Sequence, residues 1–136
     1  MAVSNNSGVK DFFIDTSDKK WNSTGSLIEK GWNNMQPLSK IQVKAITMSE
    51  LLMQYTDEAV VIDLLKMDIE GMEQSIISNC VNLLPRFRNI IIEFHESKIQ
   101  NISKIIGRLN KFFNCKVEEG DQKGLSMIYC TNKQMK

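Results

Sequence analysis

Apolar residues along the chain follow two patterns that are typical of β-strands. Residues 40–46, KIQVKAI, alternate apolar and polar side chains, as a strand with one buried face does. Residues 59–67 and 88–95 are short apolar runs rich in β-branched side chains, which is typical of strands covered on both faces. A further short strand is predicted at residues 10–15, KDFFID.

Helices are predicted after two of these strands. Thr47 and Glu50 match a capping box, and apolar residues follow them at helical spacing. A second helical face runs from Gly71 to Cys80, and Pro85 ends that pattern.

The last part of the chain predicts one more helix and a hairpin. Ser97 and Gln100 match another capping box, and residues 99–113 carry a continuous isoleucine- and phenylalanine-rich stripe. Residues 115–130 predict an antiparallel hairpin with its turn near residues 120–124.

The order strand, helix, strand, helix, hairpin predicts an α/β fold. Its sheet is expected to be mostly parallel, with right-handed crossovers and a C-terminal antiparallel hairpin. The chain has 136 residues, so we expect residues 1–136 to form a single domain. In sheets of this kind, ligands bind at the carboxyl ends of the strands.

Overall composition narrows the function classes. A net charge of +1, with 24% charged and 42% hydrophobic residues, favours neither nucleic acid nor an acidic membrane as a partner. The chain has neither an apolar run long enough to span a membrane nor a signal-peptide pattern at its start. A cytoplasmic location is the expectation.

The cysteines and the single histidine argue against a metal site. Cys80, Cys115 and Cys130 form no CxxC pair, and His95 is the only imidazole, so no metal is expected. A symmetric hairpin would place Cys115 opposite Cys130. We expect packed thiols there rather than a disulfide, because reduced thiols are the rule inside cells.

Three carboxylates gather where the strand 59–67 ends: Asp68, Glu70 and Glu73. One interpretation is helix capping and compensation of the helix dipole, and for Glu73 we expect only the latter role. The other is that Asp68 and Glu70 line a polar crevice. Glu93 and His95 end the next parallel strand, so they are expected at the same edge of the sheet.

The residue types suggest separate roles at that edge. Asp68 and Glu70, at a helix start, are poor bases but good fixed negative charges. His95 is suited to general base catalysis near neutral pH, and Glu93 could orient it. The structural alternatives are a histidine hydrogen-bonded at a strand end and a solvated carboxylate. Lys66 is expected to pair its ammonium with a carboxylate of this edge.

Several stretches, in this order, resemble the FkbM-type methyltransferases, which are class I enzymes that use S-adenosylmethionine. The most specific is IDLLKMDIEGMEQSII (62–77), which carries the K-x-D-x-E-G-x-E string, and NIIIEFH (89–95) follows it. AVSNNSGVKDFFID (2–15), NSTGSL (22–27) and VKAITMSELL (43–52) are similar to the family's A-x-S-x-x-x-G, Asn/Ser-rich and T-x-x-x-L-L segments.

The resemblance implies a fold, a reaction and a set of site residues. It implies part of a Rossmann-like class I methyltransferase sheet that transfers methyl groups from S-adenosylmethionine to a hydroxyl of a sugar or natural-product-like small molecule. The candidate catalytic residues are then His95, Asp68 and Glu93. The candidate substrate- or cofactor-binding residues are Glu70, Lys66 and Ser4.

The chain departs from the family pattern in one respect. Class I methyltransferases hold the cofactor on a glycine-rich turn, and this chain has no G-x-G. The chain is therefore expected to correspond to the C-terminal portion of the domain, without the N-terminal cofactor-binding half. That half, or a second copy of the chain, is the expected macromolecular partner. A non-catalytic binding or assembly module and a split enzyme remain the alternatives.

Overall fold

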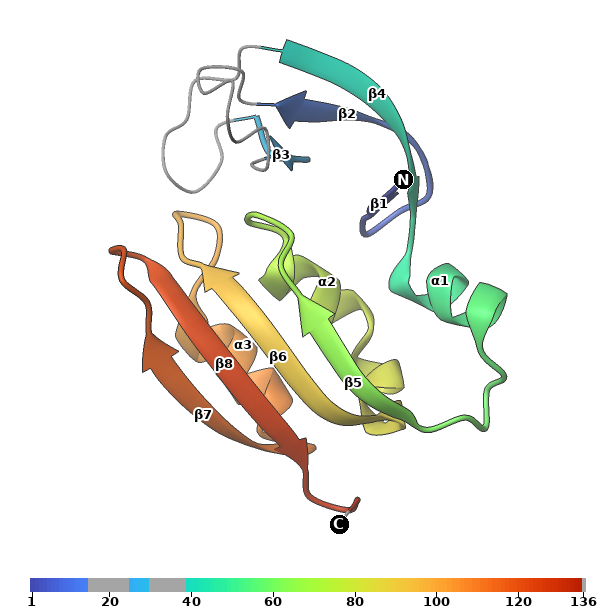
Figure 1. Cartoon of the computed structure of the whole chain (residues 1–136), viewed down its shortest axis with the longest axis vertical. Helices are drawn as coiled ribbons and strands as arrows, with labels where there is room; N and C mark the ends of the chain where they lie inside the picture. The colour runs from blue at the N-terminus through green and yellow to red at the C-terminus, as the bar shows by residue number, and fades with distance from the viewer. Residues whose placement is uncertain (15–24, 30–38, 136) are drawn as a thin grey trace.

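The chain folds around two four-stranded sheets (Figure 1). The structure, a computed structural model, describes residues 1–14, 25–29 and 39–135. The first sheet has the order β1-β4-β2-β3, and these strands are Ala2–Val3, Ser39–Ile46, Gly8–Ile14 and Gly25–Ser26. The predicted strands at 10–15 and 40–46 are thus present as β2 and β4. Asp15 and residues 22–24 of the NSTGSL segment lie outside the described residues.

The second sheet has the order β5-β6-β8-β7. These strands are Ile62–Met67, Phe87–His95, Leu125–Asn132 and Phe113–Glu119. The predicted strands at 59–67 and 88–95 and the predicted hairpin all form, although β5 begins later than expected.

The prediction of a mostly parallel sheet is wrong. In the described residues only the β1–β4 and β5–β6 pairs are parallel, and the other four pairs are antiparallel. The reason lies in the connections. A helical crossover joins β5 to β6, but β8 is the returning arm of a hairpin and inserts between β6 and β7, so it runs against both.

Helices cover one face of the second sheet. They are α2 (Glu73–Asn79), the short 3-10 helix η1 (Val81–Arg86) and α3 (Ile102–Leu109), whereas α1 (Met48–Tyr55) connects β4 to β5 and lies to one side of the sheet in Figure 1. Figure 1 shows α2 and α3 behind the strands, with the near face of the sheet not covered by a helix. In the described part of the chain, no helix is long and apolar enough to cross a membrane.

The capping predictions had different outcomes. Thr47 and Glu50 form the complete capping box of α1. The second predicted box is wrong, because α3 begins at Ile102 and Asn101 is its N-cap, accepting a hydrogen bond from the amide of Lys104. The predicted helix 99–113 is therefore shorter, and its final phenylalanine, Phe113, starts β7.

The core lies between the second sheet and its helices. Its largest fully buried members alternate along β6, line α2 and α3 and include Ile90, Ile92, Phe94, Ile76, Ile77, Ile105 and Leu109. The expectation that strands 59–67 and 88–95 are covered on both faces is wrong for 59–67, since Leu64 of β5 is 52% exposed and Val61, just before β5, is 45% exposed. Within the described residues β5 is an edge strand that pairs only with β6.

Cys115 and Cys130 are joined by a disulfide, so the prediction of packed thiols is wrong. The predicted register is confirmed, because the two residues are direct partners across β7 and β8 and their Cα atoms lie 4.2 Å apart. Residues opposite one another in an antiparallel pair come this close, which brings the two sulfur atoms within bonding reach. Cys80 is a free, buried cysteine, and burial raises the pKa of its thiol to about 11.

We expect thiol titration of the denatured, unreduced chain to detect only Cys80. The disulfide blocks the other two of the three cysteines. Prior reduction of the native chain should make Cys115 and Cys130 reactive. An unreduced Cys80→Ser variant should show no thiol, and reduction should expose two. Detection of all three thiols without reduction would contradict the disulfide.

Candidate functional site

The carboxyl ends of β5 and β6 lie beneath the first sheet (Figure 1). The turn that leaves β5 contains Glu70 and Gly71, with φ angles of 52° and 107°. A left-handed conformation is costly for a glutamate, so it needs outside support. Ser26 of the first sheet donates a hydrogen bond to the carbonyl of Glu70 at 2.7 Å. A Cβ at Gly71 would lie 3.1 Å from Ile28, so the segment that follows β3 packs directly on this turn.

A buried histidine and a buried glutamate form the centre of the site. His95 ends β6 and is 1% exposed, and its Nδ1 lies 3.0 Å from Oε1 of Glu73, the fully buried first residue of α2. Glu73 also accepts hydrogen bonds from the amide of Gly71 at 3.0 Å and from Nε2 of Gln100 at 2.7 Å. We call these two residues the Glu73–His95 pair.

Gln100 connects the pair to the surrounding elements. Its Nε2 donates to the carbonyl of His95 at 2.8 Å as well as to Glu73, and its Oε1 accepts from the amide of Gln74 in the first turn of α2. Gln100 is 3% exposed. Gln100 therefore links the end of β6 to the start of α2 through hydrogen bonds. It is not the capping residue of α3 that its spacing from Ser97 suggested.

Sequence reasoning missed the roles of Glu73 and Gln100. Glu73 was expected only to compensate the helix dipole, yet it is the hydrogen-bond partner of the histidine. A signal was present, because Glu73 shares one helical face with Ile76, Ile77 and Cys80, all of which are buried. A carboxylate within an apolar stripe is costly unless it has polar partners, so its position implied a buried partner.

Three carboxylates surround the other ring nitrogen of His95. Its Nε2 lies 3.6 Å from Glu70 and 3.9 Å from Glu93, and the ligand atoms of Asp68, Glu93 and His95 all lie within 4.8 Å of one another. We call Asp68, Glu70 and Glu93 the acidic rim. The expected meeting of the two strand ends is confirmed.

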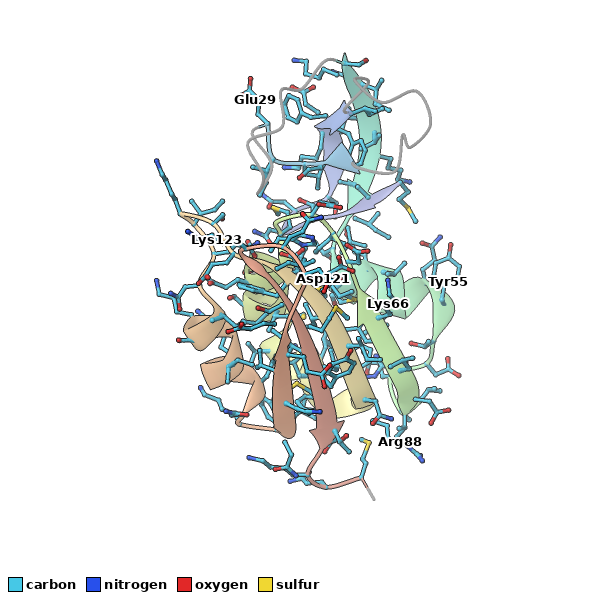
Figure 2. All side chains as sticks on the ribbon, turned by 60° about the vertical axis from the view of Figure 1, so that its left-hand side comes forward. Glu29, Tyr55, Lys66, Arg88, Asp121 and Lys123 are labelled. Carbon is cyan, nitrogen blue, oxygen red and sulfur yellow. A yellow bond between two sulfur atoms is a disulfide. The ribbon has the colours of Figure 1, made fainter. Side chains whose placement is uncertain are left out.

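The acidic rim reaches solvent, since its side chains are 36%, 23% and 31% exposed in chain order. Lys66 projects from β5 (Figure 2) and pairs with Asp68 at 3.7 Å, as expected. Asp68, Glu93 and His95 are the set in the described residues that could share a metal ion. The carboxylates of Asp68 and Glu93 could equally pair with His95 in its protonated form. The expectation of no metal therefore stays a prediction.

Helix capping does not account for Asp68. The N-cap of α2 is Met72, which makes no side-chain capping hydrogen bond. The acceptor for the first turn comes instead from Gln100. Glu73 accepts a hydrogen bond from the amide of Gly71, whereas Asp68 pairs with the ammonium of Lys66.

Ser4 lies apart from the acidic rim. It follows β1, is 6% exposed and donates its amide to the carbonyl of Ile46 at 2.9 Å. It lines a pocket between the first sheet and Met72, and no member of the acidic rim lines that pocket.

The pKa values of His95 and Glu73 are both shifted by their surroundings. Burial alone would lower the pKa of His95, but the hydrogen bond to Glu73 and the charges of Glu73, Glu70 and Asp68 outweigh it, so the net shift is upward from 6.5. Burial alone would raise the pKa of Glu73, but its hydrogen bonds to His95, Gly71 and Gln100 lower it below 4.5. Glu73 is therefore ionised down to lower pH, and the ring of His95 keeps its proton up to higher pH, than an ordinary glutamate and histidine.

The family model for the methyltransferase FkbM domain matches residues 1–122. The chain belongs to the FkbM methyltransferase family. No curated protein and no solved structure matches it. Membership implies S-adenosylmethionine-dependent methyl transfer, with S-adenosylmethionine as the family's cofactor.

The residues of this FkbM domain fit one part of that cofactor. A sulfonium centre is cationic, and the acidic rim offers fixed negative charge beside a fixed imidazole. The chain has no G-x-G turn to approach the cofactor's amino acid and ribose portions. The fit is therefore to the reacting centre and not to the rest of the molecule.

We expect His95 to titrate above pH 6.5 in the folded chain, because nearby carboxylates stabilise its protonated form. It is the only histidine, so its ring proton resonances in NMR report the titration directly. Glu73→Gln should lower the midpoint, since it removes the closest negative charge. Glu118→Gln is the matched control, because Glu118 lies on β7, with β8 between it and β6. An unchanged midpoint in Glu73→Gln would contradict the assignment.

The same shifts predict how stability depends on pH. A raised histidine pKa stabilises the fold below the unfolded value of 6.5 and loses its effect as pH rises through the folded value. A lowered glutamate pKa stabilises above the unfolded value of 4.5 and loses its effect as pH falls through the folded value. In urea unfolding, the pair should therefore contribute most to the free energy of unfolding between the two unfolded values, pH 4.5 and pH 6.5. Glu73→Gln should remove that maximum.

Proposed function

We propose that this domain transfers a methyl group from S-adenosylmethionine to a hydroxyl of a sugar or natural-product-like small molecule, with His95 as general base. The observation that carries the proposal is the arrangement of His95, held on one side by buried Glu73 and facing the acidic rim on the other. This arrangement lies at the strand ends, where α/β folds bind ligands.

The hydrogen bond to Glu73 determines which nitrogen acts. It places the proton of the neutral ring on Nδ1, which leaves the lone pair on Nε2, the atom that faces Glu70 and Glu93. Nε2 would take the proton of the acceptor hydroxyl as its oxygen bonds to the methyl carbon and the methyl–sulfur bond breaks. The imidazolium that forms is stabilised by Glu73.

The acidic rim and Lys66 have positioning roles in this proposal. When bound, S-adenosylmethionine supplies an electrophilic methyl group on a positively charged sulfur. Asp68 and Glu70 contribute negative charge where that positive charge would lie, and Glu93 can accept a hydrogen bond from the acceptor. Lys66 holds Asp68 through their ion pair, while Ser4 binds ligand in the neighbouring pocket.

The cofactor-binding half is proposed to pair with β5. Within the described residues, the outer edge of β5 has no strand beside it, and Val60, Val61 and Leu64 are exposed next to it. Exposed edges with apolar flanks are normally covered in native proteins. We infer that a strand from the N-terminal half of the domain occupies this edge and brings the glycine-rich turn to the acidic rim.

A non-catalytic binding module is the second candidate function. The absence of any G-x-G favours it, because the chain lacks the segment that holds the cofactor in class I enzymes. Restoring that half in cis or in trans separates the two candidates. Methyl transfer that appears on restoration supports the enzyme, and its continued absence with every acceptor supports the module.

In the enzyme with its cofactor-binding half supplied, we expect His95→Gln to lower kcat by about 10²–10⁴-fold, the usual contribution of a general base. KM for the acceptor should change little. Glu73→Gln should shift the acidic limb of the pH–rate profile to lower pH, because it lowers the pKa of His95. Glu118→Gln should leave both quantities unchanged, and a similar small loss in all three variants would remove His95 from the mechanism.

The chain alone is expected to bind S-adenosylmethionine weakly or not at all, as measured by calorimetric titration. Light scattering should show self-association through β5, or unfolding should show marginal stability. Leu64→Lys should reduce that association. Ile41→Lys, which changes a similarly exposed residue on β4, should not. A stable monomer that binds the cofactor with micromolar affinity would show that the site is complete as it stands.

A further inference from the structure

The side chain of Gln100 contacts both members of the Glu73–His95 pair. Gln100 lies five residues beyond His95 and is 3% exposed. Its Nε2 donates to Oε2 of Glu73 at 2.7 Å and to the backbone carbonyl of His95 at 2.8 Å. Its Oε1 accepts from the amide of Gln74 at 2.8 Å. The side-chain amide therefore uses both its nitrogen and its oxygen inside the protein.

These contacts fix which way the amide of Gln100 faces. Turning the amide over would exchange its oxygen and its nitrogen. The oxygen would then face two acceptors, the Glu73 carboxylate and the His95 carbonyl, while the nitrogen would face the N–H donor of Gln74. All three hydrogen bonds would be lost in a buried place, which is costly. In the folded chain Gln100 is thus a donor toward Glu73.

Gln100 in turn fixes the plane of the Glu73 carboxylate. The last torsion of a glutamate side chain is broad, so hydrogen bonds at one oxygen alone do not set that plane. Oε1 of Glu73 faces Nδ1 of His95 and the amide of Gly71, each at 3.0 Å. Oε2 is held separately, by Gln100. With Oε2 held in this way, Oε1 is kept directed at the imidazole ring.

The position of the ring proton depends on this arrangement. Neutral His95 carries its proton on Nδ1 because a carboxylate oxygen faces that atom, and a carboxylate that turns away removes the preference. The proton can then move to Nε2, the atom that acts as the base in the proposed function. We propose that Gln100 is a positioning residue for His95, because it holds Glu73 so that the neutral ring keeps its proton on Nδ1. The catalytic part of this proposal rests on the proposed function, and the effect on the ring proton does not.

A purely structural role for Gln100 is the alternative, and Gln74 provides the comparison. The side-chain Oε1 of Gln74 accepts from the amide of Asn101 at 2.7 Å. This hydrogen bond also joins the start of α2 to the segment before α3, but it involves neither Glu73 nor His95. Its loss should loosen the contact between the same two segments without moving the ring proton.

The test is the tautomer of neutral His95 in the full chain, read from its ring nitrogen chemical shifts above the titration midpoint. Gln100→Met keeps the length of the side chain and removes its hydrogen bonds. It should lower the ratio of the Nδ1–H form to the Nε2–H form about fivefold or more, roughly the effect of one hydrogen bond. Gln74→Met should keep the native ratio. Equal ratios in all three chains would overturn the proposal, and so would equal changes in both variants.

A measurement on the native chain does not depend on the stability of a variant. The side-chain amide protons of Gln100 should exchange slowly with solvent, since their nitrogen is bonded to two buried acceptors. They should also shift with the same midpoint as the His95 ring, because that titration changes the charge beside the carboxylate they bind. The amide protons of Gln74, which bonds through its side-chain oxygen, should exchange faster and shift less. A rapidly exchanging Gln100 amide that ignores the ring titration would contradict the proposal.

The enzyme with its cofactor-binding half supplied separates this proposal from the proposed function. Gln100→Met should lower kcat about fivefold or more, because a carboxylate that turns away stabilises the imidazolium less. KM for the acceptor should stay nearly unchanged, since Gln100 is buried. Gln74→Met should leave both quantities unchanged. A lower kcat with an unchanged tautomer ratio would overturn the positioning role. A changed ratio with an unchanged kcat would support that role and remove His95 as the base.

Discussion

A single buried interaction, between Glu73 and His95, organises the candidate site. Removing a carboxylate from water is costly, and here three hydrogen bonds offset that cost, from the His95 ring, the Gly71 amide and the Gln100 side chain. Those donors come from the end of β6, the turn before α2 and the segment before α3. The pair therefore fixes how three parts of the chain meet, and any change in it alters both packing and acidity.

The first sheet contributes by holding the turn above this pair. Glu70 has a left-handed backbone, and the hydroxyl of Ser26 bonds its carbonyl while Ile28 packs against Gly71. This support keeps the acidic rim close to Nε2 of His95. Residues far apart in the sequence are thus needed to maintain one local conformation, which is common where a backbone is strained at a functional site.

The two faces of the second sheet are unequally covered. α2 and α3 cover one face, while Leu64 and Val61 remain exposed near the edge strand β5. The FkbM family match covers most of the chain, so the resemblance and the fold describe the same region.

Sequence alone determined the elements and their local signals: the strands β2, β4 and β6, the capping box of α1, the register of Cys115 with Cys130, and the meeting of Asp68, Glu93 and His95 at neighbouring strand ends. These follow from periodicity and from connections between adjacent elements. Tertiary structure alone decided that most strand pairs of the described residues are antiparallel, that Gln100 bonds Glu73, His95 and Gln74 instead of capping α3, and that Glu73 is buried against His95. The physical reason is that these features depend on which residues from distant segments become neighbours, and a buried polar group takes its role from those neighbours rather than from its own spacing.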